Sequence, residues 1–215
     1  FLLAHWKAAF WSAFSVLFYV LVYTVWLKRR SPQNIVIGGI AGATPPLIGW
    51  AVAAAETGAL AGMNPLDLGS PVPWMLFMLI FLWTPPHFWA LALYRSGEYA
   101  KAKVPMMNEV RGSKSTLNQS KAYCGLLLML GSVPCFWPAS GLPLLWAFTS
   151  GGLTVWYAKS VWAIDPQEPF DENGRMPKAA KSFFRSLFYL GWMFLTLVAI
   201  SAVPPGWLGY LGPLA

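Results

Sequence analysis

A histidine inside an apolar, aromatic stretch is the first candidate for chemistry. His87 lies within the run Trp83-Thr84-Pro85-Pro86-His87-Phe88-Trp89. A titratable side chain in such surroundings is a candidate ligand of a metal or haem iron, or a proton-transfer group. A neutral histidine that is hydrogen-bonded to a carbonyl of a neighbouring helix explains the same pattern, so both interpretations stay open.

A long connection after this stretch combines basic residues with carboxylates. Its basic side chains are Arg95, Lys101, Lys103, Arg111, Lys114 and Lys121. Glu98 and Glu109 lie among them. This mixture suits a phosphorylated anion held partly through Mg²⁺, because Mg²⁺ prefers one or two carboxylates together with substrate phosphates. Lys28, Arg29 and Asn34, which we place on the same membrane face, could add donors. A solvated basic loop is the alternative interpretation.

The amino-acid composition indicates which class of protein carries these residues. The 215 residues include 15 Lys+Arg and 8 Asp+Glu, for a net charge of +7, and 57% are hydrophobic. Only 11% are charged, against about 25% in typical soluble domains. The mean hydropathy is +0.51. These values exclude a soluble enzyme, a disordered tail and a nucleic-acid-binding protein, and they indicate an integral membrane protein.

Long apolar blocks predict the elements that position the candidate residues. A spanning helix needs about 20 apolar residues, and six blocks qualify: 8–26, 35–55, 71–94, 122–138, 142–164 and 183–203. The blocks lack the period-2 alternation of membrane β-barrels, so the remaining spanning structure is the helix. The sequence therefore predicts an all-α, polytopic membrane helical bundle.

The connections between these blocks alternate in charge. The first holds Lys28, Arg29 and Arg30, the second has no basic residue, and the third is the long basic connection. The fourth is uncharged, and the fifth is basic again. Because Lys and Arg are retained on the cytoplasmic side, we expect the basic connections to be cytoplasmic. The net charge is then mainly a topology signal, and nucleic acid is not an expected partner.

Two blocks carry the same interruption, Thr44-Pro45-Pro46 and Thr84-Pro85-Pro86. Proline removes a backbone donor and clashes with the preceding turn, so we expect each helix to kink or break there. Freed carbonyls at membrane depth are tolerated where they face protein or a polar cavity. The two breaks therefore favour a shared internal cavity. Gly38 and Gly42, spaced as GxxxG, predict close approach of a neighbouring helix.

Several of these motifs together resemble a known family. They are the stretch Tyr23–Trp50, which holds Lys28-Arg29-Arg30 and Thr44-Pro45-Pro46, the run Trp83–Ala92, and Val104-Pro105-Met106. The chain resembles the protoheme IX farnesyltransferase, or haem O synthase, branch of the UbiA intramembrane prenyltransferases. The motifs are specific from about Tyr23 to Tyr123, and beyond that the pattern of spans is similar.

This resemblance implies a nine-helix bundle of which the six blocks are the fourth to ninth spans. Residues 1–215 are then one partial prenyltransferase domain, without the amino-terminal spans that carry the first Asp-rich motif. The implied reaction transfers farnesyl from farnesyl diphosphate to a vinyl group of haem b, with Mg²⁺ as cofactor. The implied location is the bacterial inner membrane with a cytoplasmic active face, or the mitochondrial inner membrane in a eukaryote. Haem A synthase or terminal oxidase assembly is an implied partner.

The resemblance also implies roles for individual residues. Lys28 and Arg29 match the family's basic pair and are expected to contact the diphosphate, with Arg95 and Lys103 as further candidates. Glu98 matches the second acidic motif and is the expected Mg²⁺ ligand. His87 matches the family's histidine and is the expected haem contact or axial ligand. Tyr99 is a further candidate in the same loop.

The sequence departs from the family at two points in this loop. Glu98 stands where Asp is usual, and Met107-Asn108-Glu109 stands where Leu-Pro-Val is common. Two other functions are alternatives to the resemblance. One is a polytopic transporter or haem-handling assembly factor that binds without chemistry, and the other is a UbiA relative that prenylates an aromatic quinone precursor.

Overall fold

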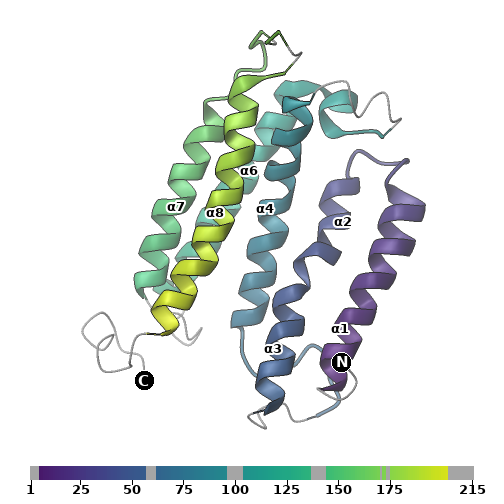
Figure 1. Ribbon diagram of the computed structural model, residues 1–215, viewed down its shortest axis with the longest axis vertical. Coiled ribbons are helices and arrows are strands. Elements are labelled where there is room, and N and C mark those ends of the chain that lie inside the picture. The colour runs from purple at the N-terminus through teal and green to yellow at the C-terminus, as the bar shows by residue number, and fades with distance from the viewer. Residues whose placement is uncertain are drawn as a thin grey trace. The chain divides into compact units, whose positions relative to one another are not determined.

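The structure is a computed structural model that describes residues 5–56, 62–95, 104–136, 144–169, 171–172 and 175–202. Within these ranges every regular element is a helix, which confirms the all-α prediction. The elements are α1 (Trp6–Leu17), the π-helix η1 (Phe18–Leu27), α2 (Asn34–Ala43), α3 (Pro45–Glu56), α4 (Val72–Tyr94), α6 (Met107–Phe136), α7 (Leu144–Trp162) and α8 (Pro177–Ser201) (Figure 1). The chain divides into two compact units, residues 1–81 and 82–215, and α4 passes from one to the other.

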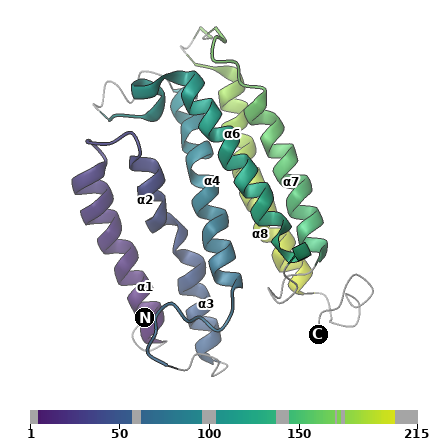
Figure 2. The same ribbon diagram turned by 180° about the vertical axis from the view of Figure 1, so that it is seen from behind.

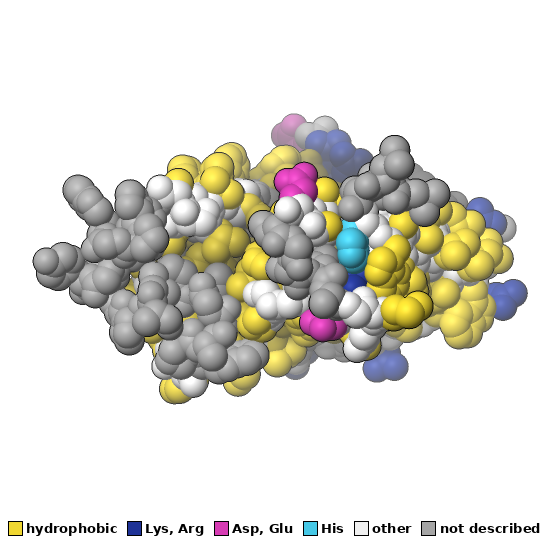
Figure 3. Space-filling view, turned by 90° about the horizontal axis from the view of Figure 1, so that it is seen from below, with side chains coloured by type: hydrophobic (Ala, Val, Ile, Leu, Met, Phe, Trp, Pro, Cys, Tyr) yellow, Lys and Arg dark blue, Asp and Glu magenta, His cyan; other side chains and the backbone are white. Residues whose placement is uncertain are grey.

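Four stretches of helix are long and apolar enough to cross a membrane, namely Trp6–Leu27, Asn34–Glu56, Val72–Tyr94 and Pro177–Ser201. They correspond to the first, second, third and sixth predicted spans. The other two predicted spans lie in α6 and α7, whose helices do not meet the same criterion of length and hydropathy. Hydrophobic side chains cover much of the described surface seen from below (Figure 3). The side chains of Val25 and Phe148, for example, are 70% and 73% exposed, as expected for a protein that faces lipid.

In the first unit, η1 follows α1 without a break and contacts α2. A Cβ atom at Gly38 would collide with the ring of Tyr23 on η1, whereas a Cβ atom at Gly42 would meet nothing within 4 Å. Gly38 therefore permits the close approach of these two helices, as the sequence predicted. Gly42 is exposed and has no such role.

The loop between α3 and α4 is held by side chains from three helices. Four successive backbone carbonyls of this loop each accept a hydrogen bond. The donors and acceptors are Trp11 Nε1 to Pro65 O (3.0 Å), Trp74 Nε1 to Leu66 O (3.2 Å), Lys7 Nζ to Asp67 O (2.6 Å) and Trp50 Nε1 to Leu68 O (3.0 Å). Leu68 is buried with Ala8, Leu47 and Ala51. We call this arrangement the carbonyl clamp.

The two Thr-Pro-Pro interruptions have different outcomes. At the first, α2 ends at Ala43, and α3 begins at Pro45 after the single residue Thr44. At the second, α4 stays helical from Val72 to Tyr94 with Pro85 and Pro86 inside it. The predicted break is confirmed in the second span. In α4 the helix does not break, and the alternative prediction of a kink there stays a prediction. The backbone of α4 keeps its helical course although two consecutive residues lack a backbone donor.

In the second unit, α6, α7 and α8 lie side by side in both views (Figures 1 and 2). Their interface contains small and polar residues, as is usual between helices in membranes. A Cβ atom at Gly131 on α6 would lie 2.7 Å from Ser150 Oγ on α7, so these helices need the glycine for their close approach. One turn further along α7, Thr154 shares a hydrogen bond of 3.1 Å with Tyr189 of α8.

Candidate functional site

The candidate site begins with the side chain of His87, which is 6% exposed on α4. Its imidazole lies between two aromatic rings. Trp83, one turn earlier on α4, stacks on the imidazole with a centroid distance of 4.2 Å, and Phe183 of α8 stacks on it at 4.8 Å. Phe88 contacts the imidazole edge at 5.1 Å. Because three rings contact the imidazole, its orientation is fixed by packing.

A hydrogen bond to Ser186 of α8 selects the tautomer of this imidazole. His87 Nδ1 lies 2.5 Å from Ser186 Oγ, and Ser186 Oγ donates to the carbonyl of Phe183 at 2.6 Å. A serine hydroxyl has one proton to donate, so His87 Nδ1 must be the donor to Ser186 Oγ. In the neutral ring, the proton is then on Nδ1 and the lone pair is on Nε2.

Such an imidazole can act as a ligand or accept a proton through Nε2. Metal-ligating histidines usually donate their other ring N–H to an oxygen acceptor, which orients the ring and fixes the tautomer. Here the acceptor is Ser186 Oγ, and among the described residues the one hydrogen-bonding partner of the ring lies at Nδ1. The geometry therefore suits iron ligation or proton transfer.

Ser186 is the residue of this site that sequence reasoning missed. Its backbone carbonyl accepts from Trp83 Nε1 at 2.9 Å, so one residue holds both Trp83 and His87. The buried residues of α8 include Ser182, Ser186 and Tyr189, which follow the i, i+4, i+7 spacing of one helix face. In the sequence, polar residues at this spacing within an otherwise apolar helix could have indicated a buried polar face that includes Ser186.

The predicted basic pair lies in the first unit, directly after η1. Lys28 and Arg29 occupy a turn, with Arg29 exposed and Lys28 partly exposed. Asn34 Nδ2 donates to the carbonyl of Lys28 at 3.2 Å, and Lys28 N donates to Tyr23 O at 2.8 Å. Hydrogen bonds to residues before and after it therefore stabilise the turn that carries Lys28 and Arg29.

Arg95 lies in the second unit, directly after the helix that carries His87. It follows the last residue of α4, is exposed, and its backbone N–H donates to Leu91 O at 2.9 Å. Eight residues separate it from His87, which is about 12 Å along a helix. Its guanidinium lies 6.0 Å from the ring centroid of Tyr94. Glu98, Tyr99 and Lys103 lie outside the described residues.

The described residues after this loop include a buried amide oxygen that could serve a metal ion. Met106 and Met107 are buried, and Asn108 Nδ2 donates to Ala92 O at 3.4 Å and to Glu109 Oε1 at 3.3 Å. Asn108 Oδ1 is buried without a hydrogen-bond partner in the described part of the chain. Amide and carboxylate oxygens are ligand types that Mg²⁺ accepts. The described residues contain no group of three or more His, Cys, Asp or Glu side chains that could hold a metal.

Comparison with known proteins gives a consistent result. Residues 1–188 match the UbiA prenyltransferase family. The chain is similar to proteins named protoheme IX farnesyltransferase from Bartonella bacilliformis (44% identity, covering 89% of this chain and 57% of the relative) and Parvibaculum lavamentivorans (45%, 91% and 57%). It is also similar to the protein of that name from Brucella ovis (43%, 92% and 58%).

The chain thus spans between 57% and 58% of the length of these curated relatives. No solved structure was found to match it. The match to the family covers most of the chain, including α4, the basic turn after η1 and the part of α8 that contacts His87. The chain belongs to the UbiA prenyltransferase family.

Proposed function

We propose that this chain is part of a membrane prenyltransferase that transfers farnesyl from farnesyl diphosphate to haem b. The observation that carries the proposal is the 43–45% identity, over about nine tenths of the chain, to proteins named protoheme IX farnesyltransferase. In this reaction the bond between farnesyl C1 and the diphosphate oxygen breaks, and C1 bonds to the terminal vinyl carbon. Water adds its hydroxyl to the other vinyl carbon and releases a proton, so the products are haem O and diphosphate.

We assign His87 to the haem. Its tautomer, fixed by Ser186, leaves the Nε2 lone pair for the iron, and the aromatic rings stacked on the imidazole hold it in an apolar environment. Aromatic faces also stabilise cations, which suits an allylic carbocation derived from farnesyl. Axial ligation would position the vinyl group relative to this cation.

The diphosphate is assigned to the basic residues near the ends of the spans. Lys28 and Arg29 would contact it from the turn after η1, and Arg95 and Lys103 from the connection after α4. Mg²⁺ bound with the diphosphate would neutralise the charge on the leaving oxygen. Glu98 is the proposed ligand of this ion, with Asn108 Oδ1 as a further oxygen close to the same loop in sequence.

We place these groups at the cytoplasmic face of the bacterial inner membrane, or the equivalent face of the mitochondrial inner membrane. The support is the alternation of basic connections in the sequence. Haem O serves terminal oxidases, so haem A synthase or an oxidase assembly factor is the proposed partner that receives the product.

The test uses the full-length protein in membranes supplied with haem b, farnesyl diphosphate and Mg²⁺. Haems are extracted and resolved by mass, and we expect a haem carrying a hydroxyethylfarnesyl group. The variant His87→Ala should lose haem binding and product, whereas His5→Ala, which removes the other histidine of this chain, should retain both. Unchanged haem b together with a prenylated quinone precursor would assign the enzyme to a different acceptor.

A further inference from the structure

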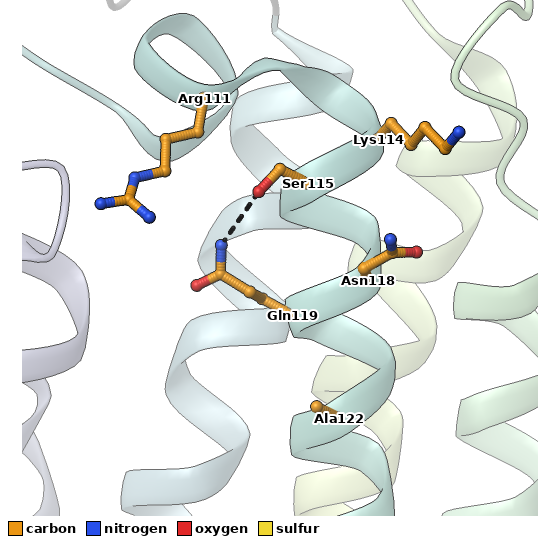
Figure 4. Close-up of a pocket in the computed structure, with 6 residues that line it drawn as sticks. All are labelled: Arg111, Lys114, Ser115, Asn118, Gln119 and Ala122. Carbon is orange, nitrogen blue, oxygen red and sulfur yellow. Dashed lines mark hydrogen bonds between the residues drawn. The ribbon is translucent and has the colours of Figure 1, made fainter.

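The face of α6 near its amino terminus forms a groove of about 570 Å³. The groove is lined by Arg111, Lys114, Ser115, Asn118, Gln119 and Ala122. From Lys114 to Ala122 these positions follow one another in steps of three residues and one residue, so they lie on one helix face. Arg111 belongs to the segment before Gly112. Figure 4 shows Arg111 and Gln119 extending to one side of α6, with Lys114 and Asn118 on the other. We call this surface the α6 groove.

The side chains of the α6 groove are mainly hydrogen-bond donors. Arg111 and Lys114 are exposed, and within the described residues neither makes an ion pair or a side-chain hydrogen bond. Gln119 Nε2 donates to Ser115 Oγ at 3.4 Å, which leaves the Ser115 hydroxyl proton to donate to a ligand (Figure 4). Among the described residues, none that lines the groove carries a carboxylate. Such a set suits a phosphate group, whose oxygens accept several hydrogen bonds from Arg and Lys.

The backbone adds to this positive character. Gly112 has φ 78° and ψ 159°, which interrupts α6 and starts a new helical segment at Ser113. Lys114 and Ser115 therefore stand in the first turn of that segment, where backbone N–H groups and the helix dipole favour an anion. A positive φ is costly for residues other than glycine, so the turn that brings Arg111 beside this helix end depends on Gly112.

Beyond Ala122 the same face of α6 becomes apolar. Leu126 and Met129 continue the spacing of the groove and are 44% and 68% exposed. The apolar block of the sequence also begins at Ala122. Lys114 and Met129 are about 22 Å apart along the helix, which covers the headgroup region and roughly half of a ~30 Å hydrocarbon core. The face therefore matches an amphiphile with a phosphate head and a hydrocarbon tail.

We infer that the α6 groove binds the phosphate headgroup of an anionic phospholipid, with an acyl chain along Leu126 and Met129. The groove is open and formed by a single helix, so it gives no protection from water to a reactive carbocation. This openness favours a resident lipid over the prenyl diphosphate as its occupant. Basic clusters at this depth attract anionic lipids. The inference is independent of the proposed prenyl transfer, because it uses none of the residues assigned to that reaction.

The experiment measures lipid binding to the purified full-length protein by native mass spectrometry in detergent. Phosphatidylglycerol is the anionic probe and phosphatidylcholine the zwitterionic one. We expect Arg111→Gln/Lys114→Gln to weaken phosphatidylglycerol binding by roughly tenfold, since each basic side chain near an anionic surface contributes several-fold. The matched control is Lys159→Gln/Lys181→Gln, which removes two exposed basic residues of the same unit and should bind like the unmodified protein.

Three results would overturn the inference. The first is an equal loss in both double variants, which would indicate net charge rather than a site. The second is equal binding of phosphatidylcholine, and the third is displacement of phosphatidylglycerol by farnesyl diphosphate or inorganic phosphate with the same dependence on Arg111 and Lys114. The charge-retaining variant Arg111→Lys/Lys114→Arg should bind normally, and its melting temperature provides the control for folding.

Discussion

At the scale of single residues, Ser186 and His87 show how a weak sequence signal becomes specific in three dimensions. The sequence offered a lone histidine in an aromatic run, compatible with a ligand or with a buried structural residue. The structure adds the acceptor on α8, and the second hydrogen bond of that hydroxyl decides which nitrogen of the ring is protonated. The line of polar residues in α8 marks Ser186 as a residue of a buried helix face, but its pairing with His87 could not be predicted, because 99 residues separate the partners and no local pattern links them.

The role of Ser186 can be tested apart from its contribution to packing. Ser186→Ala removes the acceptor for Nδ1, and the loss of such a partner typically costs about 10–100-fold in metal affinity. We expect haem affinity to fall by roughly tenfold, with a shifted Soret band that reports altered ligation. Ser186→Thr retains the hydroxyl and should restore both. An unchanged Soret band in Ser186→Ala, with full loss in His87→Ala, would show that Ser186 does not tune the ligand.

At the scale of elements, the sequence predicted the helices better than their irregularities. Apolar blocks identified the spans, because hydropathy over about 20 residues is a property of the segment alone. The prediction of a break at Thr44-Pro45-Pro46 was also correct, but the same tripeptide in α4 leaves the helix continuous. The burial of Lys7 was not predicted, since its acceptor at Asp67 lies 60 residues away.

The contact between η1 and α2 makes a prediction about Gly38. Gly38→Ala places a methyl group against the Tyr23 ring, and overpacking of this kind typically costs about 1–3 kcal/mol. Gly42→Ala is the matched control, because a Cβ atom there meets nothing within 4 Å and alanine favours the helix by roughly 0.5–1 kcal/mol. Thermal unfolding in detergent should therefore show a lower melting temperature for the first variant and an unchanged or higher one for the second.

The carbonyl clamp makes a second prediction at this scale. Trp50→Phe keeps an aromatic ring but removes the donor to Leu68 O, and an unsatisfied buried acceptor costs about 1–3 kcal/mol. We expect faster amide hydrogen exchange in residues 62–71 of this variant. Trp192→Phe, which changes an exposed tryptophan of α8, should leave the exchange of that segment unchanged. Equal exchange in all three proteins would mean that the indole bond does not hold the loop.

At the scale of the whole molecule, the residues assigned to the proposed reaction come from both compact units of the chain. The described residues supply the histidine site, the basic turn after η1 and Arg95. The family resemblance supplied the function, since apolar periodicity and charge alone predicted only a polytopic protein with a basic face. The pattern of apolar and charged residues identifies a membrane bundle, because it reflects the lipid and water around the chain. The reaction depends on a few polar residues, which composition does not reveal.

The metal requirement is testable at this scale. In the full-length protein, chelation of Mg²⁺ should abolish formation of the farnesylated haem. Glu98→Gln removes the carboxylate while retaining the side-chain length, and we expect at least a roughly tenfold loss of activity that higher Mg²⁺ partly restores. Glu98→Asp should stay active, because it keeps the charge. Glu56→Gln is the control, as Glu56 lies at the end of α3 and is exposed. Full activity of Glu98→Gln in low Mg²⁺ would remove this residue from the metal site.

The carbonyl clamp also bears on the biogenesis of the protein. Its donors come from α1, α3 and α4, and the last to be synthesised is Trp74. The loop carbonyls therefore have their full set of partners only after the start of α4 has emerged from the ribosome. Until then, water or the insertion machinery must satisfy them. This loop of the first unit is thus completed only with the start of the third predicted span.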